Sequence, residues 1–188
     1  LTGCSSIAKS IECSIAMCEI LNKSDFKATL IKAHSKLLRA IENPTGIFDL
    51  KKDRSRFSMD WYYPILSGAT LEDNFVKYIK KITDIFWIPS FGIKCVADEP
   101  WVTVAETCEC SIAFKKIGHE KNAKELLINA SAIVDENSVP YMGWQLEEKI
   151  YWPEEQPSWT SGALILAADA NNTLTKASNL FLTKQFRS

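Results

Sequence analysis

The sequence has only two histidines among its 188 residues, and its six cysteines form no CxxC pair. Zinc sites are usually built from cysteine and histidine at short spacings, so we expect no metal site. GxSxG, HExxH, GxGxxG and P-loop motifs are also missing. We therefore expect no cofactor, and we expect the cysteines to be free thiols in a reducing, cytoplasmic compartment.

Neither sign of charge dominates the chain. The 22 basic and 23 acidic residues nearly cancel, and no long basic run occurs. This balance favours neither a nucleic-acid partner nor an anionic membrane surface. No apolar run approaches the ~18 residues that cross a bilayer, so no membrane partner is expected. A chain of 188 residues with 46% hydrophobic residues can form one domain with a sizeable core.

Segments of small and apolar residues alternate four times with amphipathic segments. The first kind covers 3–21, 61–71, 101–117 and 159–170, and the second covers 25–41, 73–86, 120–134 and 174–186. Within the first kind, the string ECSIA occurs at 12–16 and again at 109–113. Crowded inner helices need small residues and outer helices face water, so we predict an all-α fold of four helical hairpins, as in an α/α solenoid or toroid. The links at 87–100 and 135–158 are expected to hold short strands.

Three of the four predicted inner helices begin with a carboxylate, an aromatic ring and a proline within about one turn. These starts are Asp60-Trp61-Tyr62-Tyr63-Pro64, then Asp98-Glu99-Pro100-Trp101 with Glu106 one turn in, and Glu154-Glu155-Gln156-Pro157-Ser158-Trp159-Thr160. Each feature alone also suits an ordinary helix start, where acids complement the dipole and proline fits the first turn. In a toroid the inner helices run parallel, so we expect the three clusters to line one cavity.

Carboxylates beside aromatic rings suit a sugar ligand, because rings stack on C–H faces and acids bind hydroxyls or transfer protons. Glycoside hydrolysis needs two carboxylates, and neighbouring rings can raise the pKa of one of them toward that of a general acid. We predict a carbohydrate-active, glycoside hydrolase-like enzyme with Asp60, Glu106 and Glu155 as catalytic candidates. In the first cluster we expect Asp60 and Tyr62 to point inward and Trp61 and Tyr63 to pack between helices. The substrate-binding candidates are Trp61, Tyr62, Tyr63, Glu99, Trp101, Glu154, Trp159 and Thr160.

Four long strings resemble a bacterial family labelled prenyltransferase-like or six-hairpin-glycosidase-like. They are LTGCSSI, DRSRFSMDWYYPILSGA, GIKCVADEPWVTVAETCE and WPEEQPSWTSGALILAADA, and the resemblance covers nearly all 188 residues in the same order. It implies a six-hairpin α/α toroid, of which this chain would form an incomplete ring of four hairpins. Residues 1–188 would then be a single domain that lacks its N-terminal hairpins. The resemblance implies no catalytic position residue by residue.

Two other functions stay open from the sequence: a non-catalytic glycan-binding module, and a prenyl or terpenoid enzyme of the same toroid class. The DxDD string of terpene cyclases and the Asp, Cys and His zinc set of protein prenyltransferases are both missing. The aromatic residues would nevertheless suit a carbocation. The expected ligand is a small molecule or an oligosaccharide. An incomplete ring would leave two apolar flanks, which predicts self-association through them.

Overall fold

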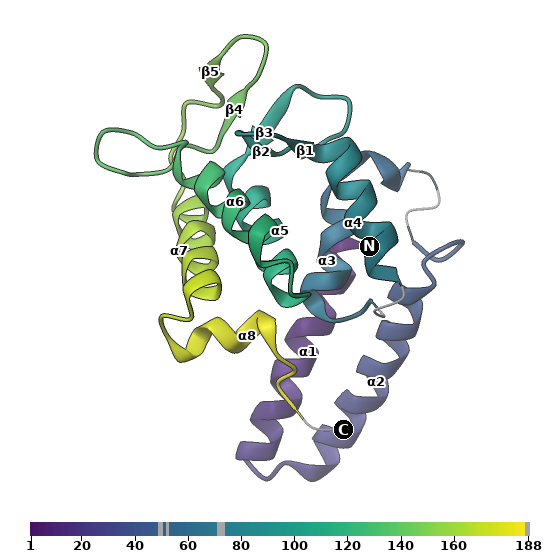
Figure 1. Cartoon of the computed structure of the whole chain (residues 1–188). Coiled ribbons are helices and arrows are strands. Elements are labelled where there is room, and N and C mark those ends of the chain that lie inside the picture. The colour runs from purple at the N-terminus through teal and green to yellow at the C-terminus, as the bar shows by residue number, and fades with distance from the viewer. Residues whose placement is uncertain (49–50, 52, 71–73, 187–188) are drawn as a thin grey trace.

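The computed structural model describes residues 1–48, 51, 53–70 and 74–186, and 61% of the chain is helical (Figure 1). This confirms the predicted all-α fold class, with eight α-helices in the described part of the chain. Short 3-10 turns lie at Arg54–Arg56 and Lys176–Ser178, and a π turn at Ile82–Phe86 continues α4. The α-helices are α1 (Thr2–Ile20), α2 (Ser24–Glu42), α3 (Met59–Ser67), α4 (Phe75–Lys81), α5 (Val104–Lys116), α6 (Glu120–Ser131), α7 (Ser158–Asn172) and α8 (Asn179–Leu182).

The helices form an inner row and an outer set. In the inner row α1 packs on α3, α3 on α5 and α5 on α7, whereas α2, α4 and α6 each pack on the inner helix that precedes them. The alternation of small, apolar segments with amphipathic ones therefore corresponds to paired helices, as predicted. This arrangement of consecutive hairpins is compatible with part of an α/α toroid. None of the described helices is long and apolar enough to cross a membrane.

The links between hairpins hold short antiparallel strands, which lie above α5 and α6 in Figure 1. One sheet pairs β1 with β2, and the other has the order β3-β4-β5, in which Thr103 lies opposite Gly143. A side chain at Gly143 would clash with the carbonyl of Val102, so glycine allows this close pairing. The strands are β1 (Trp87–Ile88), β2 (Gly92–Ile93), β3 (Trp101–Thr103), β4 (Gly143–Gln145) and β5 (Ile150–Tyr151).

Two predicted helix starts differ from the structure. Trp101 belongs to strand β3, and α5 begins only at Val104. Aromatic and β-branched residues favour strands, and the Trp101 indole N–H donates to the Trp152 carbonyl at 2.6 Å. Helix α3 begins at Met59, so Pro64 lies inside the helix rather than in its first turn. Proline has no N–H to donate, which is consistent with the shortness of α3.

The predicted helix at 174–186 is reduced to a 3-10 turn and the four-residue α8, and the helix ends at Thr183, whose backbone is extended. This C-terminal segment returns to the first hairpin. The backbone N–H of Gln185 donates to Glu12 at 2.7 Å, and the Phe186 ring meets His34 edge-on at 5.7 Å between centroids. Contacts to α1 and α2 therefore replace helical hydrogen bonds here. The main core lies between α3, α5, α6 and α7, around buried Tyr62 and Phe114.

Candidate functional site

A cavity of about 480 Å³ lies on the inner face of the helical row, and we call it the central cavity. Each inner helix contributes to its wall: Lys9 from α1, Tyr63 from α3, Glu109 from α5 and Trp159 from α7. Phe181 of α8 also lines it, and most of the lining is apolar. Such a concave, largely apolar space with a few polar groups is typical of a small-molecule site.

Glu109 carries the most distinctive chemistry in the central cavity. The Tyr63 hydroxyl donates to its Oε1 at 2.8 Å, and the Tyr62 hydroxyl donates to its Oε2 at 3.1 Å. Burial, with a smaller contribution from the charge of Glu106, raises the pKa of Glu109 to about 7, although the two tyrosine hydrogen bonds act to lower it. A carboxyl group with this pKa is partly protonated at neutral pH and can act as a general acid.

The groups around Glu109 stay protonated. Burial, and next the charge of Glu109, raise the pKa values of Tyr62 and Tyr63 above the usual tyrosine range, so both hydroxyls are donors at neutral pH. Burial also raises the pKa of the Cys95 thiol to about 12, and the charge and hydrogen bond of Glu106 add to this rise. A thiol with so high a pKa is not a nucleophile at neutral pH.

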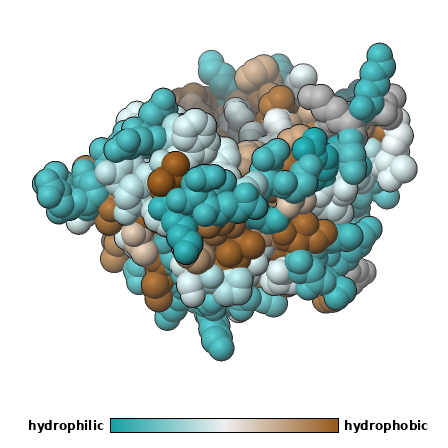
Figure 2. Space-filling model, turned by 90° about the horizontal axis from the view of Figure 1, so that it is seen from above, coloured by the Kyte–Doolittle hydropathy of each residue, from teal (hydrophilic) through white to brown (hydrophobic). Residues whose placement is uncertain are grey.

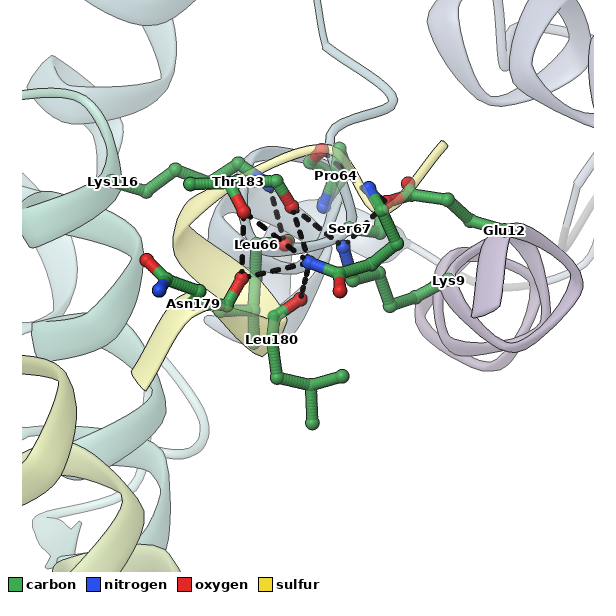
Figure 3. Close-up of polar contacts among 10 residues, drawn as sticks. Lys9, Glu12, Pro64, Leu66, Ser67, Lys116, Asn179, Leu180 and Thr183 are labelled. Atoms are coloured by element: carbon green, nitrogen blue, oxygen red, sulfur yellow. Dashed lines mark hydrogen bonds and ion pairs between the residues drawn. The ribbon is translucent and has the colours of Figure 1, made fainter. Parts of the chain in front are cut away.

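Polar contacts hold the C-terminal segment beside Lys9, one of the residues that line the central cavity (Figure 3). The Lys9 ammonium pairs with Glu12 at 2.8 Å and donates to the Thr183 carbonyl at 3.2 Å. Glu12 also accepts from the backbone of Gln185. Lys9 and Glu12 are both buried, and their mutual pairing offsets part of the cost of removing two charges from water. The C-terminal segment is thereby attached to α1 beside the cavity.

The three predicted catalytic carboxylates do not line this cavity. Asp60 is buried at the start of α3, where its Oδ1 accepts from the Thr2 hydroxyl at 2.7 Å, and it lines a different cavity of about 660 Å³. Glu106 lies buried on α5 and hydrogen-bonds Cys95. Glu155 is exposed in the link before α7. Neither of these two cavities contains all three groups, and their catalytic roles stay predictions.

The predicted aromatic residues also divide between locations. Tyr63 and Trp159 line the central cavity, whereas Trp61 lines the cavity that contains Asp60. Tyr62 is fully buried beneath Glu109, so the expected orientation is reversed for the two tyrosines: Tyr63 reaches the central cavity and Tyr62 belongs to the core. Trp101 is held by its bond to Trp152.

The remaining predicted binding residues lie outside the central cavity. Glu99 and Glu154 are exposed in the links. Thr160 is fully buried near the start of α7, and its hydroxyl has no hydrogen-bond partner in the part of the chain that the structure describes. The face that carries the links is shown in Figure 2, where hydrophobic side chains are visible between hydrophilic ones.

Glu109 is not among the predicted site residues, although a sequence signal for it exists. The repeated string ECSIA begins with Glu12 in α1 and with Glu109 in α5. An acid inside a segment of buried character is costly unless it is paired or hydrogen-bonded, and each of these two glutamates is. The acid in the repeat was therefore a stronger indication of a special environment than the acids at the helix starts, which capping and the helix dipole also explain.

No family model matches the chain. Among curated proteins, the MMP endo-(1,4)-3-O-methyl-alpha-D-mannosidase of Mycolicibacterium hassiacum is 35% identical over 181 residues. The match covers 96% of this chain and 49% of that protein, so the chain spans about half the length of the curated relative it matches. This similarity supports the glycosidase-like family that the sequence resemblance implies. The toroid and the prenyltransferase-like alternative stay predictions.

Proposed function

We propose that the chain contributes the central cavity of a glycoside hydrolase, with Glu109 as the general acid. The observation that carries this proposal is the carboxyl group of Glu109, which lies in the cavity wall between two tyrosine hydroxyls and has a pKa near 7. In glycoside hydrolysis a protonated carboxyl group delivers its proton to the leaving oxygen. The similarity to an enzyme named as a mannosidase supports an α-mannoside as the substrate class.

The lining residues support a sugar with an apolar substituent. Trp159, which is 54% exposed at the start of α7, offers an indole face on which a sugar ring can stack. Leu166, Ile112 and Phe181 give the cavity an apolar wall. A buried hydroxyl without a partner would be costly against such a wall, whereas a methyl ether would be favourable. We therefore propose 3-O-methylated α-mannosides, the kind of sugar in the relative's name, as ligands.

The proposed step begins with protonated Glu109. Its proton moves to the glycosidic oxygen, the bond from that oxygen to the anomeric carbon breaks, and the leaving group departs as an alcohol. The resulting Glu109 carboxylate is stabilised by the hydroxyls of Tyr62 and Tyr63. The positive charge that develops at the anomeric carbon requires attack by water or by a carboxylate.

The central cavity has one carboxylate among its described lining residues. We propose that the second catalytic carboxylate comes from a segment that corresponds to the half of the mannosidase outside the match. The same observation favours a second candidate function, a glycan-binding module without turnover.

Two measurements separate these functions. Calorimetry with α-(1→4)-linked, 3-O-methylated mannose oligosaccharides should show binding to the 188-residue chain in either case. Turnover, followed as new reducing ends, should appear when the chain replaces the matching segment of the mannosidase. In that chimera Glu109→Gln should lower kcat about 10²- to 10⁴-fold and leave sugar binding within a few-fold. Glu125→Gln, a change of an exposed carboxylate on α6, is the matched control. Full turnover by the Glu109→Gln chimera would refute the general-acid role.

A further inference from the structure

A cavity of about 660 Å³ lies at the amino-terminal end of α3, and we call it the peripheral cavity. It shares no lining residue with the central cavity. Trp61 and Tyr78 form one side of it, with their rings edge to face at 5.6 Å between centroids. Asp60, Arg54 and Lys77 also line it. The proposed hydrolytic step uses none of these groups.

The chemistry of the peripheral cavity suits hydroxyl groups. Its charged residues are mixed in sign, since Glu42, Asp53 and Asp60 stand with Arg54 and Lys77. Phosphate-binding pockets are instead dominated by positive charge. The side chains of Arg54 and Lys77 make no hydrogen bond or ion pair with another described residue. A hydroxyl both donates and accepts, so these donors and acceptors together fit a neutral sugar.

A third cavity, of about 270 Å³, adjoins the peripheral cavity at the amino-terminal ends of α1 and α3. It shares Asp60 and Arg54 with the peripheral cavity, and Gly3 of α1 and Met59 of α3 also line it. About one helical turn further on, Ser6 of α1 and Tyr63 of α3 line the central cavity.

Gly3 marks an open space in this series of cavities. A methyl group added at Gly3 would meet no atom within 4 Å. The third and central cavities therefore follow one another along α1 and α3, with room beside the backbone of α1, and the third cavity adjoins the peripheral cavity at Leu1, Arg54 and Asp60.

We propose that the three cavities form one groove for an oligosaccharide, in which Trp61 and Arg54 bind a sugar unit distant from the unit at Glu109. This inference rests on the proposed function and adds a specificity determinant to it. The groove assigns different roles to the two pairs of acid and aromatic residues. Glu109 and Trp159 hold the sugar at the bond to be cleaved, whereas Asp60 and Trp61 hold the far end of the chain and select for its length.

The test measures affinity against chain length. α-(1→4)-linked, 3-O-methylated mannose oligosaccharides of increasing length are titrated into the 188-residue protein by calorimetry. For the unmodified chain, affinity should rise once the ligand is long enough to reach Trp61. Trp61→Ala should remove this rise and so lower the affinity for the long ligands about tenfold. The same variant should leave the affinity for the shortest binding ligand unchanged.

A second variant tests the groove without changing the peripheral cavity. Gly3→Phe places a ring in the open space beside α1 and should likewise abolish the gain with length. Gly3→Ala, which raises helix propensity without filling the space, is the matched control and should keep the gain. Circular dichroism checks that each variant is folded.

The outcomes distinguish the groove from the function on which it rests. Three results would each overturn the groove and leave the central cavity as a site for one sugar. The first is equal affinity of the unmodified protein for short and long ligands. The others are an equal loss of affinity for short and long ligands in Trp61→Ala, and an unchanged gain of affinity with ligand length in Gly3→Phe. Failure of every oligosaccharide to bind would overturn the proposed function as well.

Discussion

Compared with the unmodified protein, the Glu109→Gln variant should become more stable as the pH rises. The ordinary glutamate pKa of 4.5 rises to about 7 for Glu109, because the folded protein buries the carboxyl group. The folded state therefore binds the proton more tightly than the unfolded state. Its contribution to stability is fully present below pH 4.5 and is lost as the pH approaches 7. The difference between the two pKa values corresponds to about 3 kcal/mol.

Urea unfolding at a series of pH values between 4 and 8 measures this effect. The quantity of interest is the free energy of unfolding of Glu109→Gln minus that of the unmodified protein. Glutamine is neutral at every pH and close in shape to the protonated acid, so this difference should be nearly constant at low pH. It should then increase by about 3 kcal/mol between pH 4.5 and 7 and become constant again above that range.

Glu155→Gln supplies the control, because Glu155 is exposed and has no contact with the central cavity. Its difference from the unmodified protein should vary much less over the same range. A difference for Glu109→Gln that stays flat from pH 4 to 8 would refute the reasoning, because Glu109 would then ionise in the folded state as it does in the unfolded one.

Two further changes probe the wall of the central cavity. Tyr63→Phe removes a hydrogen bond that lowers the pKa of Glu109, so in the same unfolding series the upper end of the pH-dependent range should move above 7; a shift to lower pH would contradict this. Trp159→Ala should change the free energy of unfolding by no more than about 0.5 kcal/mol, because the side chain is 54% exposed, yet calorimetry should show weaker binding of the shortest oligosaccharide; unchanged binding would remove Trp159 from the site.

The hairpins were predictable because the inner and the outer helix of each pair have different local residue patterns. Inner helices such as α1 and α7 are rich in Ala, Ser and Cys or Gly, whereas α2 has a clear apolar stripe, and these patterns depend on neighbours within one or two turns. The boundaries were less predictable. Residues 101–103 became strand β3 because a partner at least 40 residues away, Gly143–Gln145, pairs with them.

The site was harder to predict, because the central cavity lies about one turn below the starts of α1, α3 and α5 and reaches only the start of α7. The link strands and their turns cover the start of α5, so Glu106 is buried against Cys95 and Glu155 remains in an exposed link. Glu109 becomes special only through the two tyrosines of α3, a tertiary contact between residues 46 and 47 positions apart. The sequence reveals a cluster of acids and rings, but tertiary contacts decide which of its members share a cavity.

The most direct test of the central claim is a crystal structure of the chain with an α-(1→4)-linked, 3-O-methylated mannose oligosaccharide. The account predicts a sugar ring against the indole of Trp159, a sugar oxygen within hydrogen-bond distance of the Glu109 carboxyl group, and a methyl ether against the wall that contains Ile112 and Phe181. A ligand bound elsewhere, with the central cavity left to solvent, would contradict it.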